Sequence, residues 1–257
     1  MIDLHCHVLP GVDDGAADLS AAVEMCRLAA TDGCRTLVAT PHQRHPSWAN
    51  DDRPALESRF RELQAAAEGL VELRLGAEIR ADSSLLAEVD ELPGGALLRL
   101  AGSRYLLVEL PPVEVGIEPE TLVHELLVAG FRPILAHPEL VHYLAGDLPR
   151  AGRLVAAGAL LQVTAMSLTG DFGRLPRQAS WELLRAGHVH FVASDCHSPD
   201  WRPPGLSRAR RLVAETCGEE VAGRLTEDHP AAVVADRDLP EAAQTARYDP
   251  TMETGCD

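Results

Sequence analysis

Short apolar runs alternate with longer amphipathic stretches along most of this 257-residue chain. Apolar runs of about four to eight residues are typical of buried strands, and apolar residues spaced three or four apart predict helices. The predicted strands lie near 2–6, 35–40, 72–78, 104–109, 133–137, 159–164 and 190–194. The predicted helices lie near 18–32, 54–69, 83–91, 119–129, 149–157, 177–187 and 206–217. The pattern thus gives seven strand–helix units.

Each predicted strand is followed by a helix that can return the chain, so we expect the strands to be parallel. Repeated units of this kind form either a TIM-like barrel or an open doubly wound sheet. Histidines and carboxylates follow nearly every strand, which favours the barrel, because an open sheet gathers its ligands at one switch point. We therefore predict an α/β fold with a TIM-like (β/α)7 barrel as a single domain over residues 1–240. The polar segment 241–257 has no apolar period and is predicted to be a disordered tail.

The charge balance excludes some classes of partner. The formal net charge is −16, and all 23 basic residues are arginines. This chain lacks the basic footprint of nucleic-acid-binding proteins, so we expect no nucleic acid partner. No apolar stretch approaches the roughly 20 residues needed to span a bilayer, and no signal-like segment precedes the first strand. We therefore expect a cytoplasmic protein without membrane insertion. The six cysteines include no Cys-x-x-Cys pair, which would indicate a zinc ribbon.

Potential metal ligands lie at the far ends of the predicted strands. His5 and His7 are two residues apart on an extended segment, so their side chains point to the same face and can bind one ion. The full set of candidate ligands is His5, His7, His42, Glu78, Glu109, His137, Asp195 and His197. A lone histidine after a strand is more often structural, but five at equivalent positions with three carboxylates favour metal. The remaining histidines, 45, 124, 142, 188, 190 and 229, are interpreted as ordinary structural or surface residues.

This ligand set predicts hydrolytic chemistry. Eight ligands are too many for one ion, and imidazole with carboxylate suits manganese, zinc, iron or cobalt. Ions about 3.5–4 Å apart activate water and stabilise an in-line phosphoryl displacement, so phosphate ester hydrolysis fits. Asp13 and Asp14, in the loop after the first strand, are expected either to orient ligand histidines and assist proton transfer or to form a simple acidic turn. Glu139 has the same two interpretations.

Several motifs resemble a known superfamily. Asp3-Leu4-His5-Cys6-His7, Thr40-Pro41-His42, Glu78, Ala136-His137-Pro138-Glu139 and Ser194-Asp195-Cys196-His197 resemble the polymerase-and-histidinol-phosphatase (PHP) superfamily over nearly the whole chain. Within that superfamily, residues 7–16, 76–80, 107–111 and 202–206 resemble the bacterial CpsB/YwqE-type tyrosine phosphatases.

The resemblance implies a distorted seven-stranded barrel, up to three metal ions, often manganese, and dephosphorylation of phosphotyrosyl proteins. Substrates in that family include the bacterial tyrosine kinases that control capsule or exopolysaccharide assembly. The eight candidate ligands match the family's ligands position by position. Arg202 matches an arginine that the family uses near the phosphate, although a solvated surface arginine is the alternative interpretation.

One position departs from the family pattern. The family commonly has arginine directly after His-Pro-Glu, where this chain has Leu140. Loss of a charge-assisted contact to phosphate costs about 1.5–3 kcal/mol, so activity could be weak or directed at another phosphoester. Arg44, Arg80 or Arg104 could substitute for it. A PHP phosphatase for histidinol phosphate or nucleotide-like phosphoesters, and a noncatalytic regulatory homologue, therefore stay open as alternatives.

A cysteine motif offers a competing mechanism. Cys196 and Arg202 have the Cys-x5-Arg spacing of cysteine-dependent phosphatases. Such a loop presents backbone amides to phosphate, whereas here Pro199 removes an amide, Asp200 adds negative charge and the segment has no glycine. We therefore favour metal-activated water, and expect Cys6 and Cys196 to face away from the ligands and pack in the core.

Overall fold

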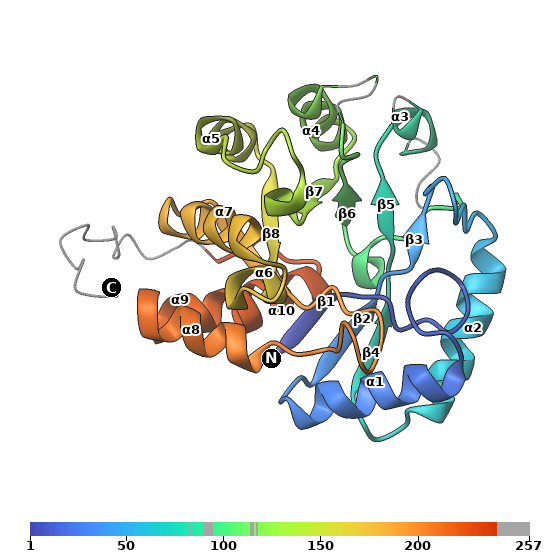
Figure 1. Cartoon of the computed structure of the whole chain (residues 1–257). Helices are drawn as coiled ribbons and strands as arrows, with labels where there is room; N and C mark the ends of the chain where they lie inside the picture. Colours follow the sequence, from blue (N-terminus) through green and yellow to red (C-terminus); the bar gives the residue numbers. More distant parts are fainter. Residues whose placement is uncertain (83, 90–94, 114–115, 117, 241–257) are drawn as a thin grey trace.

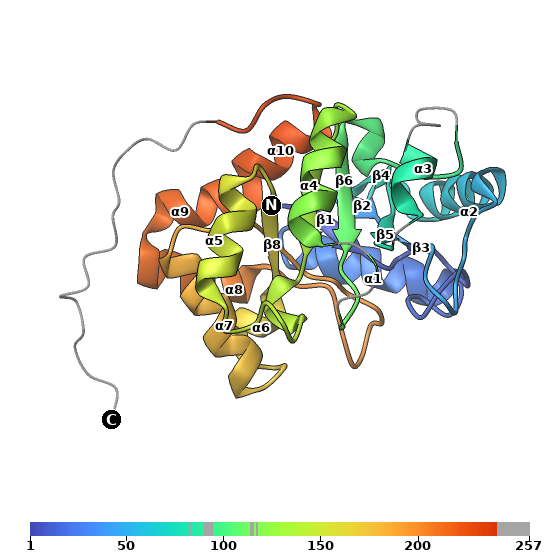
Figure 2. The ribbon, with the colours of Figure 1, turned by 90° about the horizontal axis from the view of Figure 1, so that it is seen from above.

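The computed structural model describes residues 1–82, 84–89, 95–113, 116 and 118–240. Over these residues the strands lie at the centre of the molecule and the helices lie around them, as Figures 1 and 2 show. The predicted tail at 241–257 and parts of the helix predicted near 83–91 lie outside the described residues.

Every predicted strand region contains a strand, but two of them are interrupted. The strands are β1 (Ile2–Cys6), β2 (Thr36–Ala39), β3 (His42–Gln43), β4 (Glu72–Leu75), β5 (Glu78–Arg80), β6 (Tyr105–Glu109), β7 (Arg132–Ala136), β8 (Leu160–Thr164) and β9 (Val189–Ala193). Pro41, which has no N–H for a ladder, lies between β2 and β3. Gly76 lies between β4 and β5, where a Cβ would come within 3.1 Å of the Leu100 Cα.

The helices follow the predicted order, with additions near the C-terminal side. They are α1 (Leu19–Thr31), α2 (Arg53–Ala66), α3 (Leu85–Val89), α4 (Pro119–Val128), α5 (Leu148–Ala156), α6 (Ala165–Thr169), α7 (Arg174–Arg185), α8 (Ser207–Cys217), α9 (Glu219–Gly223) and α10 (His229–Val234), with the 3-10 turns η1 (Leu100–Gly102) and η2 (Pro138–Leu140) and the π-helical segment η3 (Arg224–Asp228). The carboxylates of Asp18, Asp52 and Asp147 each accept a backbone N–H three residues later, at 2.9, 3.0 and 2.9 Å. These caps stabilise the first turns of α1, α2 and α5. The short helices α6, α9 and α10 were not predicted.

The strands form two parallel sheets. One has the order β1-β2-β4, and the other has the order β3-β5-β6-β7-β8-β9. The predicted single-domain α/β fold with parallel strands is confirmed. Over the described residues, however, the strands do not form one closed ring, because the interruptions at Pro41 and Gly76 divide the ladder.

The two sheets meet again at the carboxyl ends of β1 and β9. The Asp195 N–H donates to the His5 carbonyl at 2.9 Å, and the His7 N–H donates to the Cys196 carbonyl at 2.9 Å. Cys6 and Cys196 form an isolated parallel bridge between these bonds. The contact therefore places the histidines after β1 beside the aspartate and histidine after β9.

Apolar side chains from both sheets fill the space between the strands. This inner cluster consists of Ile2, Leu4, Val38, Leu100, Tyr105, Leu107, Ile134, Ala136, Phe191 and Val233. A larger cluster contains apolar side chains of the helices and of alternate strand positions, and Cys6 and Cys196 belong to it as expected. Among the described helices, none combines the length and the apolar character that crossing a bilayer requires.

Candidate metal centre

All eight predicted ligands lie at the carboxyl ends of strands. His5 is in β1 and His7 follows it. His42 comes after the end of β2 and begins β3, and Glu78 comes after the end of β4 and begins β5. Glu109 ends β6, His137 follows β7, and Asp195 and His197 follow β9. Strand register pairs His42 with Glu78, so it sets these two ligands side by side. The expectation that the C-terminal strand ends carry the chemistry agrees with this arrangement.

The candidate ligand atoms fall into four overlapping groups. Within each group, the nitrogen and carboxylate oxygen atoms lie within 4.8 Å of one another. The groups are His7, Asp14, His42 and His197; His5, His137 and Asp195; His5, His7 and Glu78; and His42, Glu78 and Glu109. The structure thus brings all eight predicted ligands together. It also adds Asp14, which the sequence predicted as an orienting or proton-transfer group.

The two N-terminal histidines present their nitrogens to each other. His5 Nε2 and His7 Nε2 are 3.1 Å apart. His5 Nδ1 contacts Gln162 Oε1 at 2.8 Å, and His7 Nδ1 contacts Asp13 Oδ2 at 2.9 Å, so both Nδ1 atoms donate hydrogen. Neutral rings then have only lone pairs at Nε2, and two lone pairs at this separation repel unless a cation or proton lies between them. The residues present therefore fit a divalent metal ion.

The loop after β1 holds His7 in place. Asp13 also accepts the backbone N–H groups of Gly15 and His42, at 2.9 and 3.0 Å, and so ties the loop to β3. A Cβ at Gly15 would lie 2.1 Å from the His7 carbonyl oxygen, so only glycine allows this close approach. Asp13 therefore orients the ring of a candidate ligand, which is one of the two interpretations that the sequence left open.

Glu78 is the central carboxylate of the site. It is 1% exposed, and its Oε2 lies 3.5, 3.4 and 3.0 Å from nitrogens of His5, His7 and His42. Its Oε1 contacts His137 Nε2 at 2.8 Å. Burial acts to raise the pKa of Glu78, but the neighbouring histidines hold it well below its usual value. The Glu78 carboxylate is therefore ionised, and each of its two oxygens faces a different set of histidine nitrogens.

The neighbouring carboxylates also shift the pKa values of the histidines. Burial acts to lower the pKa of His42 and His137, yet hydrogen bonds to carboxylates raise both to about 9. These carboxylates are Asp14 and Glu78 for His42, and Glu78 for His137. In the described part of the chain, His137 Nδ1 and Glu109 Oε2 are buried atoms without a hydrogen-bond partner. A divalent cation bound here would be a partner for the carboxylate oxygens and the ring nitrogens of these residues.

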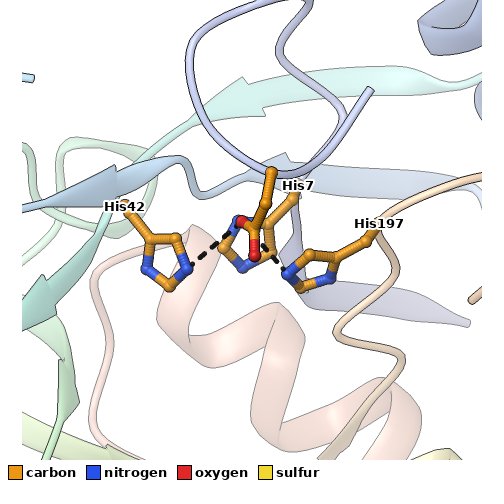
Figure 3. Close-up of side chains that lie close together, drawn as sticks. His7, His42 and His197 are labelled. Carbon is orange, nitrogen blue, oxygen red and sulfur yellow. Dashed lines mark ion pairs between the residues drawn. The ribbon is translucent and has the colours of Figure 1, made fainter. Parts of the chain in front are cut away.

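Asp14 lies at the mouth of the site between two histidines. Its Oδ1 is 3.5 Å from both His42 Nε2 and His197 Nε2. Figure 3 shows the rings of His7, His42 and His197 gathered at this point, with these ion pairs as dashed lines. Burial acts to raise the pKa of Asp14, but the histidines lower it to about 2. Burial and the charge of His7 lower the pKa of His197 to about 3. Asp14 is thus a carboxylate ligand candidate with 42% of its side chain exposed.

Two of the ligand residues have left-handed backbone conformations. His137 has a φ of 34° and Asp195 has a φ of 53°. Such conformations cost on the order of 1–3 kcal/mol each and persist only where the surroundings fix them. Asp195 is fixed by the β1 contact and by Arg202, whose guanidinium pairs with its carboxylate.

A cavity of about 440 Å³ opens onto the ligands. Arg202, Arg80 and Leu140 all line it, and the Arg202 guanidinium lies 5.1 Å from the Phe172 ring centroid. Arg80 donates to Glu109 Oε1 at 2.7 Å. Of the two other arginines considered as substitutes at Leu140, Arg44 pairs with Asp82 and Glu88, and Arg104 pairs with Asp236 and Asp238. Arg80 is therefore the arginine placed to contact a ligand in the cavity together with Arg202.

The Cys-x5-Arg segment does not form a phosphate loop. Cys196 is fully buried, and the backbone N–H groups of His197 and Ser198 both donate to the Arg202 carbonyl, at 2.9 and 3.2 Å. The amides and the thiol are thus turned away from any bound anion. The cysteine mechanism is therefore excluded by the geometry.

Some residues near the site were not predicted from the sequence. Gln162 in β8 orients His5, and the only sequence signal for it was a polar residue inside an apolar strand. His45 and Trp48 line the cavity, although His45 was interpreted as an ordinary histidine. Glu139, considered as a helper, is buried; its Oε1 accepts the Thr164 N–H at 2.8 Å, and burial raises its pKa. Glu139 therefore connects the turn that follows β7 with the end of the neighbouring strand β8.

Comparisons with known proteins agree with this site. The family model described as capsular polysaccharide synthesis, CpsB/CapC, matches residues 1–235. The tyrosine-protein phosphatase YwqE of Bacillus subtilis is 34% identical over 231 residues, which is 89% of each chain. The putative tyrosine-protein phosphatase CapC of Staphylococcus aureus is 36% identical over 209 residues, 79% of each chain.

The fold agrees with a solved relative as well. A structure from work on YwqE of Bacillus subtilis and CpsB of Streptococcus pneumoniae, described as metal-dependent tyrosine phosphatases, has a TM-score of 0.86 and 31% identity to this chain. The match covers 93% of this chain and 96% of that one. With the family model spanning most of its length, this chain belongs to the CpsB/CapC family of capsular polysaccharide synthesis proteins.

Proposed function

We propose that this protein is a metal-dependent phosphatase that hydrolyses phosphotyrosine on proteins. The observation that carries the proposal is the set of four overlapping ligand groups at the floor of one cavity that two arginines also line. The relatives are named as tyrosine phosphatases, which supports the same substrate class.

The ligands we propose are His5, His7, His42, Glu78, Glu109, His137, Asp195 and His197. Two or three divalent ions, with manganese as the proposed metal, would supply Lewis acidity and an activated water when bound. Imidazole and carboxylate ligands accept zinc, iron or cobalt as well, so cellular supply decides among them.

The chain's own residues bind and orient the substrate. Arg202 and Arg80 lie on the cavity wall, and their planar guanidinium groups suit phosphate oxygens. Asp14, partly exposed beside His42 and His197, is placed to hold a proton of the attacking water or of the product. A phenolate leaving group has a pKa near 10, so departure from an aryl phosphate needs less help from a general acid than departure of an alkoxide. No covalent intermediate on the protein is required.

We extend the proposal to the cellular setting. The family's role in capsular polysaccharide synthesis favours a phosphorylated bacterial tyrosine kinase as protein substrate. The cysteines in the described part of the chain, Cys6, Cys26, Cys34, Cys196 and Cys217, are all free thiols, which favours action in the cytoplasm. We also propose that both sheets together form a distorted barrel, supported by the Cys6–Cys196 bridge and the shared inner cluster.

The test combines elemental analysis with turnover assays. Purified protein loaded with manganese should hydrolyse phosphotyrosyl peptides, and a chelator should abolish this activity. The matched control is Cys196→Ser, which should keep the activity because the thiol is buried away from the cavity. Faster hydrolysis of histidinol phosphate than of phosphotyrosyl peptides, or activity that survives chelation, would contradict the proposal.

A further inference from the structure

Three aromatic rings form a stack at the mouth of the metal cavity. The rings of His45 and Trp48 lie 4.7 Å apart at 25°, and the ring of the ligand His42 lies 4.9 Å from His45. The Trp48 ring is also nearly parallel to His42, at 5.5 Å and 7°. Each ring of the stack therefore lies close to the other two, and the group contains both a candidate metal ligand and a half-buried tryptophan.

The backbone fixes this stack in advance of any ligand. The Arg44 N–H donates to the Ala49 carbonyl at 2.9 Å, and the Trp48 N–H donates to the His45 carbonyl at 3.0 Å, which closes a tight turn. The Arg44 side chain is anchored by Asp82. A bound substrate therefore does not have to order the turn that carries His45 and Trp48, so the entropic cost of binding is lower.

The stack faces a cavity that also has apolar wall residues. Leu110, Leu140 and Val141 line the same cavity as His45 and Trp48. Arg202 and several candidate ligands line it too, so a phosphate bound by them would have its ester group within this cavity. The leucine at position 140, which removes a charge expected from the family, adds apolar surface here.

We propose that Trp48 and His45 bind the aromatic ring of phosphotyrosine and thereby select aryl over alkyl phosphates. The inference rests on the proposed phosphatase function and names the residues that decide its substrate class. Offset or edge contacts between aromatic rings add attraction beyond the burial of apolar area. An alkyl phosphate, such as phosphoserine, offers no ring to this wall and gains less from it.

Turnover provides the first test. In manganese-loaded protein, Trp48→Ala should lower kcat/KM for a phosphotyrosyl peptide about threefold to tenfold more than for glycerol phosphate, mainly through KM. Trp48→Phe, which keeps a ring, should retain most of the preference. The matched control is Trp201→Ala: Trp201 is 64% exposed and its ring lies 6.0 Å from His197, but it lines a different cavity. This change should leave the aryl-to-alkyl ratio as it is.

Binding without turnover provides the second test. Phenylphosphonate should bind the metal-loaded protein more tightly than methylphosphonate, and Trp48→Ala should remove about threefold to tenfold of this difference in calorimetry. Equal effects of Trp48→Ala on both phosphonates, with wild-type phosphotyrosine turnover intact, would overturn the ring assignment and leave the phosphatase proposal standing. If the wild-type protein did not hydrolyse phosphotyrosine but still preferred phenylphosphonate, the phosphatase proposal would be overturned and the ring assignment would stand.

Discussion

At the scale of single residues, Asp13 connects a candidate ligand to the next strand. It accepts from His7 Nδ1 and from the His42 backbone N–H, so it fixes both the ring and the loop. We expect Asp13→Ala to lower metal affinity and activity by about 10- to 100-fold, as is usual when a group that orients a ligand is lost. Metal titration followed by phosphatase assays would measure this.

The matched control for this change is Asp18→Ala. Asp18 is an exposed aspartate five residues later that caps α1 through the Ala21 N–H. Its removal should cost about 1 kcal/mol of stability and leave metal affinity as it is. Equal metal affinity in the two variants would contradict the orienting role of Asp13.

Arg80 and Leu140 allow a second prediction at this scale. Arg80→Ala should lower kcat/KM about 10- to 100-fold, because it removes a charge-assisted contact to phosphate worth about 1.5–3 kcal/mol. Adding Leu140→Arg to this variant should restore part of the activity, since position 140 lines the same cavity. The control is Arg104→Ala, which alters an arginine that pairs with Asp238 and does not line the cavity. No loss in Arg80→Ala would contradict the proposed phosphate contact.

The sequence predicted the metal ligands but not every residue around them. Ligands that end apolar strands can be found because strand ends converge in a parallel fold. The position of Asp14 among the ligands depends on a loop that folds back where Gly15 meets His7, and no periodicity reports that. The stack of His45 and Trp48 depends likewise on a turn, so its role appears only when the chain is folded.

At the scale of elements, β8 and β9 are paired through a bulge. Leu161 pairs with Val189 and Gln162 pairs with Phe191, so His190 has no residue opposite it in the ladder. Its Nδ1 accepts the Leu161 N–H at 3.1 Å and takes the place of a backbone carbonyl. The ring must therefore stay neutral. Burial, with the nearby His229, lowers the pKa of His190 to about 4.

This bulge predicts a pH dependence of stability. Between about pH 6.5 and pH 4 the unfolded chain binds a proton at His190 and the folded chain does not, so stability falls as the pH falls through this window. His190→Gln, which keeps an acceptor, should flatten that part of the curve in denaturant unfolding of metal-loaded protein. His124→Gln, on the surface of α4, serves as the control. An unchanged slope in His190→Gln would contradict the assignment.

The order of elements followed from the sequence, and their interruptions did not. Helices with aspartate caps, such as α1 after Asp18, begin within two residues of the prediction. The strand β3 after Pro41 was not predicted because its two residues are too few to show a period. The break at Gly76 was not predicted because the need for glycine comes from Leu100, which is distant in sequence. The short helices α6, α9 and α10 contain too few residues to show a helical period.

At the scale of the whole molecule, the metal site joins both sheets. Its ligands follow β1 of one sheet and β3, β5, β6, β7 and β9, of which the last five belong to the other sheet. Bound ions should therefore stabilise the entire fold, by about 2.7 kcal/mol at a concentration 100 times the Kd. Chelation should lower Tm and manganese should restore it, measured by calorimetry. In Glu78→Gln this metal-dependent rise should be smaller, because Glu78 belongs to two of the four ligand groups; an unchanged rise would contradict the site.

Glu78 belongs to two of the four ligand groups, and its two carboxylate oxygens can serve two ions. An ion that occupies one group therefore fixes a side chain that the next ion also needs, and the entropy of ordering that side chain is lost only once. We expect filling of the centre to be cooperative, with a sigmoidal manganese isotherm. A cell with little manganese would then contain mostly empty and fully loaded molecules, so that phosphatase activity would respond steeply to metal supply.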